Sequence, residues 1–278
     1  MSAVPFSPLR MALIAQNTLR EAVRQRLVLF FVALAFAFVL GARWLRDFDF
    51  GASELKFLAD CGFGAMTFFG AALTIAGTAQ LFFSEIENRT ALTLLAKPVW
   101  RAEFILGKFF GVVALIAGFC ALLTLLLALV LWSRERELAG ALTGDLARSV
   151  GVHYPNLALA GLLQWLKLSV LAALVLLVAS FAQSQLFTMA TGFLLLVICH
   201  LQHLAQEAYA RGGNAAGRMV GWLLAGVFPN FQLFGLADSW LAAETPGWPA
   251  VSRVVVYAVA YIGAACALAI FSFRQREL

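Results

Sequence analysis

The chain has 278 residues, of which 62% are hydrophobic and only 13% are charged. A soluble globular domain carries about 25% charged residues, so this composition leaves too little polar surface for a soluble protein. The net charge of +5 does not indicate a nucleic-acid partner, because membrane proteins keep Lys and Arg at their cytoplasmic face. The composition predicts an all-α polytopic membrane protein surrounded by membrane lipid.

The first predicted element is an interfacial amphipathic helix over residues 9–26. At 100° per residue, most of its polar side chains fall on one arc and most apolar ones on the other, with Leu13 and Ile14 as exceptions. Such a helix lies in the membrane interface and leads into the first span. Basic residues before a span also occur in signal peptides, but no Ala-x-Ala cleavage site follows, which favours an uncleaved signal anchor.

Six apolar stretches are long enough to cross a membrane, since a span needs about 20 residues. They cover residues 27–45, 61–83, 109–132, 159–182, 186–204 and 254–273. With no internal repeat visible, we predict one transmembrane domain over residues 1–278. Six spans put both chain ends on the same side. Lys and Arg then number ten on the N-terminal side and nine on the other, a difference too small to fix the orientation.

A seventh apolar stretch, 219–236, is interrupted near its middle by Pro229 and Asn230. Proline removes a helix hydrogen bond and clashes with the preceding turn. We therefore predict a re-entrant helical hairpin before the last span, buried against protein where its free backbone groups find partners. A kinked seventh span is the alternative.

The polar segment 84–108, SEIENRTALTLLAKPVWRAEFILGK, has good helix formers and no glycine before Gly107. A plain connector would be short and rich in Gly, Ser or Asn. We predict a short amphipathic helix over 87–95, a stop at Lys97-Pro98 and a new helix start near Arg101. The residues that could contact a soluble partner, with the proline that fixes the bend, are Glu85, Glu87, Arg89, Lys97, Pro98 and Arg101.

This segment contains Thr90-x-x-x-Leu-Leu, then Lys-Pro-Val-x-Arg, then Gly107-Lys108, and it strongly resembles the cytoplasmic loop of ABC-2-type (type V) ABC transporter permeases. Asn17-Thr18-x-x-Glu21, the six spans and Phe228-Pro229-Asn230-Phe231 extend the resemblance more loosely over the chain. In that family the matching loop, between the second and third spans, carries a coupling helix. The resemblance implies the same role for residues 85–101.

The resemblance also implies partners and a location. The chain would be the permease subunit of an ATP-driven transporter, usually an exporter, working as a dimer of two such or related chains on two cytoplasmic ABC ATPase subunits. Its membrane would be the bacterial inner membrane, with both termini in the cytoplasm.

The chain has no phosphate-binding loop of the type G-x-x-x-x-G-K-[ST], because Gly107-Lys108 is followed by Phe109 and lacks the upstream glycine. Neither H-E-x-x-H nor G-x-S-x-G occurs. We therefore expect a transport subunit that is not itself an enzyme and has no cofactor of its own. ATP would bind to the separate ATPase subunit.

Lys167, with Gln164 one turn earlier, lies eight residues into the fourth predicted span, roughly 12 Å from its outer end. A charge at that depth costs about 2.5–3.5 kcal/mol, so it usually faces a bundle interior or a wet cavity. One interpretation is a translocation-path residue. The other, which the sequence alone favours, is a structural lysine that extends to the surface or pairs with an acid such as Asp60.

Cys199 and His203 share a helix face at the end of the fifth span and could ligate a soft metal ion. Two ligands on one helix do not complete a site, so packing is the favoured interpretation. Two functions from other classes stay open. A membrane anchor or assembly component could use the same fold without moving a solute, and a secondary transporter would need inverted repeats. The substrate cannot be inferred from the spans.

Overall fold

The structure is a computed structural model that describes residues 7–44, 54–87, 100–141, 152–211, 219, 226–235 and 247–274. In these ranges the chain is helical and has no β-strand. Its elements are α1 (Pro8–Arg24), α2 (Arg26–Ala42), α3 (Glu54–Glu87), α5 (Arg101–Ala141), α7 (Tyr154–Phe181), α8 (Gln185–Arg211), the 3-10 helix η2 (Phe231–Gly235) and α10 (Trp248–Arg274). Five helices of this described part are long and apolar enough to cross a membrane, or six if the bent pair α1–α2 counts as one span.

The six predicted spans correspond to α2, α3, α5, α7, α8 and α10, but α3 and α5 are longer than predicted. The 41 residues of α5 extend over about 60 Å at 1.5 Å per residue, about twice the hydrocarbon core of a bilayer. By contrast, α2 has only 17 residues. The apolar pattern located the helices correctly and missed their polar ends, because helices continue beyond the hydrocarbon region.

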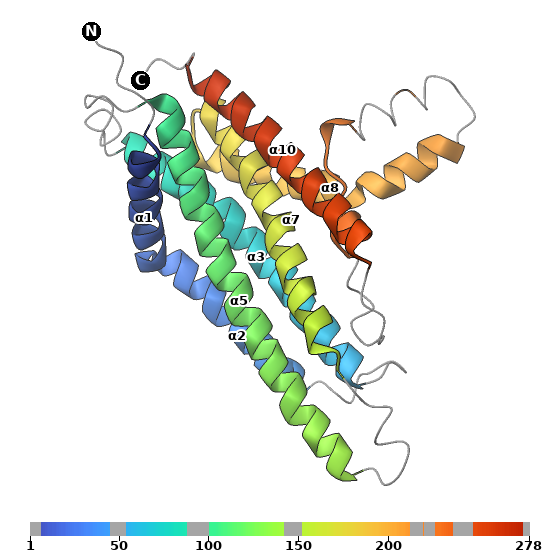
Figure 1. Cartoon of the computed structure of the whole chain (residues 1–278). Helices are drawn as coiled ribbons and strands as arrows, with labels where there is room; N and C mark the ends of the chain where they lie inside the picture. The colour runs from blue at the N-terminus through green and yellow to red at the C-terminus, as the bar shows by residue number, and fades with distance from the viewer. Residues whose placement is uncertain are drawn as a thin grey trace.

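The central helix is α7, which contacts α3, α5, α8 and α10 (Figure 1). In the most apolar 18-residue stretch of α7, 67% of the residues are buried, compared with 22% in the corresponding stretch of α8 and 28% in that of α10. A helix that is apolar on all sides is expected in the middle of a bundle. The bundle therefore holds Gln164 and Lys167, both on α7, near its centre.

Glycines allow α3, α5 and α7 to approach closely. A Cβ added at Gly70 on α3 would lie 2.7 Å from Leu168 Cδ1 on α7, and a Cβ added at Gly161 would collide with Thr124 on α5. Small residues at such contacts are typical of packed membrane helices. They bring Thr67, one turn before Gly70, within reach of α7.

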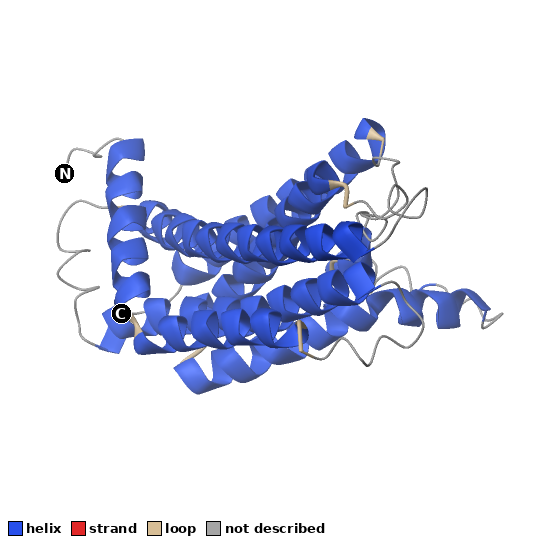
Figure 2. Ribbon diagram, turned by 90° about the horizontal axis from the view of Figure 1, so that it is seen from below, coloured by secondary structure: helices blue, strands red, loops and turns tan. Residues whose placement is uncertain are grey.

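The N-terminal helix α1 packs on α5 through Gly107-x-x-x-Gly111. A Cβ at Gly107 would lie 2.7 Å from Ile14 Cβ, and one at Gly111 would lie 2.6 Å from Thr18 Cβ. Figure 2 shows α1, beside the N label, running across the direction of the long helices, and the chain bends by 65° where α1 meets α2. In this packing Thr18 is buried, whereas Leu9 and Leu13, the latter an exception to the predicted arcs, are exposed. The interfacial position of α1 stays a prediction.

Candidate functional site

The predicted coupling segment lies between the end of α3 and the start of α5. Glu85 and Glu87 belong to the last turn of α3, which continues without a break through Glu87, so the two residues end a membrane helix instead of opening a separate one. Arg101 is the first residue of α5, which confirms the predicted helix start. Residues 102–108, predicted as part of the loop, are helical. Arg89, Lys97, Pro98 and most of the predicted helix 87–95 lie outside the described residues.

A fully buried carboxylate, that of Glu103, fastens the start of α5 to α1. Its Oε1 accepts a hydrogen bond of 2.7 Å from the Ser7 N–H and lies 3.3 Å from Arg10 Nη2. Its Oε2 accepts a hydrogen bond of 3.2 Å from the Trp100 N–H, as a glutamate at the third helical position does in a capping box. Glu103 therefore satisfies backbone groups of two helix starts at once.

Two cations of α5 bond to backbone carbonyl groups of two other helices. The buried Lys108 donates a 2.8 Å hydrogen bond from Nζ to the carbonyl of Leu81 on α3. Arg101 donates a 3.1 Å hydrogen bond from Nη1 to the carbonyl of Phe273 in the last turn of α10. Arg101 is thus a cation at a helix C-terminus, where it stabilises one of the last carbonyl groups, whereas the Leu81 carbonyl lies six residues before the end of α3.

Aromatic rings fill the space between these polar contacts. Phe104 of α5 stacks on Phe273 of α10 at 5.8 Å between ring centroids, and Phe82 of α3 meets Phe273 edge-on at 5.9 Å. Beside them, Ser84 donates a 3.0 Å hydrogen bond to Glu21 of α1. We call the set Arg10, Glu21, Phe82, Ser84, Arg101, Glu103, Phe104, Lys108 and Phe273 the stem joint. It connects α1, α3, α5 and α10 around both ends of the coupling segment.

A second site lies in the bundle, where Gln164 and Lys167 line a cavity of about 620 Å³ together with Thr67, His200 and Phe231. Gln164 Nε2 donates a 3.0 Å hydrogen bond to Thr67 Oγ1 on α3. Lys167 is only 8% exposed, and its Nζ lies 5.6 Å from the ring centroid of Phe231. The Lys167 side chain is therefore buried within this chain. The translocation-path interpretation and the structural one, in which Lys167 pairs with an acid such as Asp60, both stay predictions.

The segment containing Pro229 and Asn230 lies against this cavity. The Asn230 side chain accepts a 2.9 Å hydrogen bond from the Gln232 N–H, and the Asn230 N–H donates one of 2.8 Å to the hydroxyl of Tyr257 on α10. The following helix η2 contacts α7 and α8 and places the buried Phe231 in the cavity wall. Pro229 and Asn230 thus form a turn anchored to α10, while residues 220–225 and 236 of the predicted hairpin lie outside the described residues.

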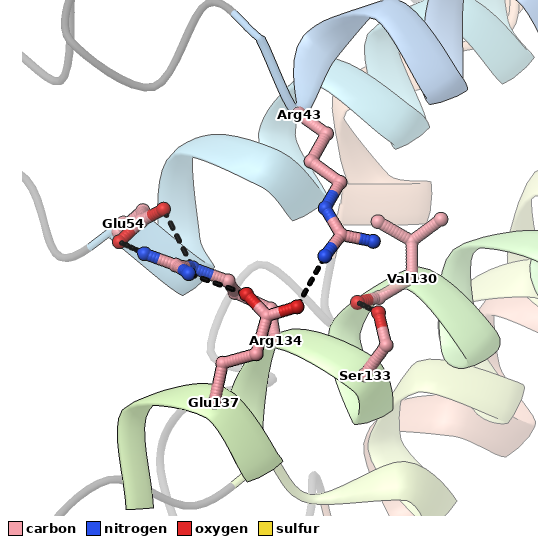
Figure 3. Close-up of polar contacts among 6 residues, drawn as sticks. All are labelled: Arg43, Glu54, Val130, Ser133, Arg134 and Glu137. Carbon is pink, nitrogen blue, oxygen red and sulfur yellow. Dashed lines mark hydrogen bonds and ion pairs between the residues drawn. The ribbon is translucent and has the colours of Figure 1, made fainter. Parts of the chain in front are cut away.

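At the opposite end of α5, ion pairs connect α2, α3 and α5 (Figure 3). Arg134 binds the carboxylate of Glu54 through two hydrogen bonds of 2.8 Å and contacts Glu137 at 2.5 Å. Glu137 also pairs with Arg43, which follows α2. We call these four residues the distal ion pairs. They are partly exposed: 42% of the Arg43 side chain and 43% of the Glu137 side chain are accessible.

The sequence analysis did not predict a role for Glu103, and it did not place His200 at the cavity. The signal for Glu103 was its place three residues after Trp100, at a predicted helix start. His200 lies beside the Cys199–His203 pair that the sequence analysis examined for metal binding, and it lines the cavity with Lys167. In the part of the chain that the structure describes, no group of three or more His, Cys, Asp or Glu side chains is placed to hold a metal ion.

Comparison with known proteins adds one finding. A family model described as "ABC-2 family transporter protein" matches residues 12–278, which is nearly the whole chain. No curated protein matches the sequence. Membrane components of this family normally work with a cytoplasmic ABC ATPase. The match includes the cavity, the distal ion pairs and every residue of the stem joint except Arg10.

Proposed function

Because this chain belongs to the ABC-2 family of transporter membrane components, we propose that it is the permease subunit of an ATP-driven exporter, and that residues 85–101 receive the motion of a separate ATPase. The observation that carries this proposal is the stem joint. At the start of α5, Glu103 and Arg101 connect the coupling segment to α1 and α10 through buried and half-buried contacts. At the end of α3, Ser84 and Phe82 make the corresponding contacts to α1 and α10. A force applied to this segment therefore acts on four helices together.

In this mechanism ATP binds only to the ATPase subunits, and their closure moves the coupling segment. Glu85, Glu87, Arg89, Lys97 and Arg101 supply the charged contacts, and Pro98 keeps the bend stiff. The stem joint then passes the motion to the spans. The charged contacts fix register and partner choice, as charges at protein interfaces generally do.

The topology in this proposal has six spans, α2, α3, α5, α7, α8 and α10, with both termini in the cytoplasm of a bacterial cell. The start of α1 and the end of α10 meet at the stem joint, as an even number of crossings requires. Residues 226–235 then belong to a re-entrant element that enters from the outer side. Exposed apolar side chains on α8 and α10, such as Val197, Val256 and Phe271, would contact lipid and a second permease chain.

Charge reversal in the coupling segment tests the central part. The variant Glu85→Arg with Arg101→Glu should insert and fold but lose the ATPase in a pull-down, or leave its ATP turnover uncoupled from the reconstituted permease. Truncating an interfacial charge that is buried against a partner costs about 2–5 kcal/mol, whereas truncating a rim charge costs little. Pro98→Ala should reduce coupling more than assembly, because it loosens the bend without removing a contact.

Two controls keep this test specific. Arg101 also donates to the Phe273 carbonyl, so Glu85→Arg alone separates the partner contact from that internal bond. Arg136→Glu changes an exposed charge at the other end of α5 and should leave both capture and turnover unchanged. If the doubly reversed permease still captures the ATPase and supports normal turnover, the coupling assignment is wrong.

Single cysteines test the topology with a membrane-impermeant label. Cysteines at Trp44, Arg136 and Trp248, all exposed, should react from outside intact cells. Cysteines at Leu9 and Trp100 should react only after the inner side is opened. If Trp248 reacts from the inner side, the segment before α10 crosses the membrane and the six-span topology fails.

A further inference from the structure

Residues 226–235, which we call the wall segment, form one side of the cavity. Phe231 and Phe234 line this cavity of about 620 Å³, and they are only 1% and 5% exposed. Both rings belong to η2, which contacts α7 and α8. The rings therefore close the cavity on this side, and it opens there only if the wall segment moves.

The wall segment is held by two tyrosines of α10. The hydroxyl of Tyr257 accepts a 2.8 Å hydrogen bond from the Asn230 N–H, and the hydroxyl of Tyr261 donates one of 3.2 Å to the Gly226 carbonyl. The Tyr257 ring also lies 6.5 Å from the Phe234 ring and 4.8 Å from the Tyr261 ring, measured between centroids. Residues four apart lie on the same face of a helix, so one face of α10 holds the wall segment at two points.

The same helix ends in the stem joint. Phe273 is 0% exposed, its ring stacks on that of Phe104, and its carbonyl accepts a hydrogen bond from Arg101. It lies 16 residues after Tyr257, roughly 24 Å along the helix axis at 1.5 Å per residue. Because α10 is one continuous helix from Trp248 to Arg274, and rigid helices carry coupling between distant sites, it joins the stem joint to the wall segment.

Between these two places α10 packs mainly on α7 (Figure 1). Its buried side chains there are small, namely those of Ala258, Ala265, Cys266 and Ala269. Small side chains interlock little, and packed helices can slide past one another by small shear movements. The packing therefore allows α10 to shift along α7 as one body.

We infer that α10 links the stem joint to the cavity, so that a shift of the joint moves the wall segment through Tyr257 and Tyr261. The dependence of this movement on ATP rests on the function proposed above, whereas the energetic link between Phe104 and Tyr257 does not. The alternative is that the wall segment follows α7 and α8, which η2 also contacts, and that the two tyrosines only stabilise it locally.

Hydrogen exchange of the wall segment, measured on the whole purified chain in nanodiscs without any ATPase, tests the link. Tyr257→Phe removes the hydroxyl that accepts from the Asn230 N–H, so this exchange should rise about fivefold. Phe104→Leu removes the ring that stacks on Phe273 and should also raise it about fivefold. Added to Tyr257→Phe it should have little effect, because the bond through which it acts is already absent. Arg101→Met, which removes the bond to the Phe273 carbonyl, gives the same test if Phe104→Leu does not fold.

Phe119→Leu is the matched control. Phe119 is also a buried ring of α5, 3% exposed, but it lies against Gly70 of α3. It should leave the exchange of the wall segment unchanged. Equal increases for Phe104→Leu and Phe119→Leu would show that the exchange reports on overall stability, and would overturn the link. A full fivefold effect of Phe104→Leu in a chain that already carries Tyr257→Phe would overturn it as well.

The assembled complex separates this link from the proposed function. ATP on the partner ATPase should change the exchange of the wall segment in the wild type, and Tyr257→Phe combined with Tyr261→Phe should remove that change. If ATP has no effect on the wild type although the paired variants show the link, the proposed coupling to an ATPase is wrong and the link stands. If ATP changes the exchange equally in the wild type and in the doubly substituted chain, the wall segment does not move through α10 and the inference is wrong.

Discussion

The two ends of α5 are held by different chemistry. At the stem joint Glu103 is fully buried, Lys108 is 1% exposed, and both bond to the backbone of neighbouring helices. At the other end the distal ion pairs connect side chain to side chain and are partly open to solvent. Removing a buried charge that bonds to backbone groups strongly destabilises the folded protein, whereas an exposed ion pair contributes little to its stability. In the proposed mechanism, we therefore expect the stem joint to move as a unit and the helices at the distal ion pairs to separate.

The largest effect is expected at Glu103. Glu103→Ala should lower the free energy of unfolding by about 3 kcal/mol, near the low end for breaking a buried ion pair, because Arg10 is 26% exposed and can regain water. Thermal unfolding in detergent measures this loss. Glu103→Gln keeps a carbonyl acceptor and should lose less. If Glu103→Ala lowers the free energy of unfolding no more than the same change at an exposed glutamate, the stem joint does not contribute substantially to stability.

The α1 contact should give the next largest effect. Gly111→Ala should destabilise the chain by about 1–3 kcal/mol, since its Cβ would lie 2.6 Å from Thr18 Cβ and 2.9 Å from the Ala15 carbonyl oxygen. Gly118, on the same helix, has nothing within 4 Å of an added Cβ. Gly118→Ala should therefore be neutral, or stabilising by up to about 1 kcal/mol. Equal effects of the two variants in the same unfolding assay would contradict the packing of α1 on α5.

At the distal ion pairs the expected loss is smaller. Arg134→Met should cost about 1 kcal/mol, as for surface pairs with good geometry, because two bonds to Glu54 and one to Glu137 disappear. This cost should shrink in 1 M salt, where the Debye length falls to about 3 Å. Unfolding curves of the variant and the wild type at low and high salt measure this dependence. A loss of stability that does not change with salt would indicate that these ion pairs are buried.

The smallest effect is expected for Glu137→Gln. Glu137 is the most exposed member of the distal ion pairs, and Arg134 keeps its contact with Glu54 in the variant. Stability should change less than for Arg134→Met at low salt, and both variants should converge on the wild type at high salt. If Glu137→Gln lowers stability more than Arg134→Met, the expected ranking of these two residues is wrong.

How much of this could be predicted from sequence differs between the two kinds of site. Hydrophobic runs of about 20 residues, which a membrane span requires, located six of the helices, and five of these are long and apolar enough by themselves to cross a membrane. Only part of the stem joint could be predicted. Arg101 and Lys108 belong to the coupling motif, but their hydrogen-bond acceptors are the backbone carbonyl groups of Phe273 and Leu81, which no sequence pattern identifies. The cavity depends on helix packing: Lys167 was noticeable as a charge in a span, but its neighbours His200 and Phe231 come from segments far along the chain.

Distances within the assembled complex test the central claim most directly. Spin labels at Leu13 on α1 and Phe110 on α5 report on the stem joint, and labels at Trp44 and Arg136 report on the distal end; all four positions are exposed. Labelled permease is diluted with unlabelled chain and measured with and without ATP on the partner ATPase. The account predicts an unchanged distance at the joint and a changed distance at the distal end. A shift at the joint as large as the one at the distal end would contradict it.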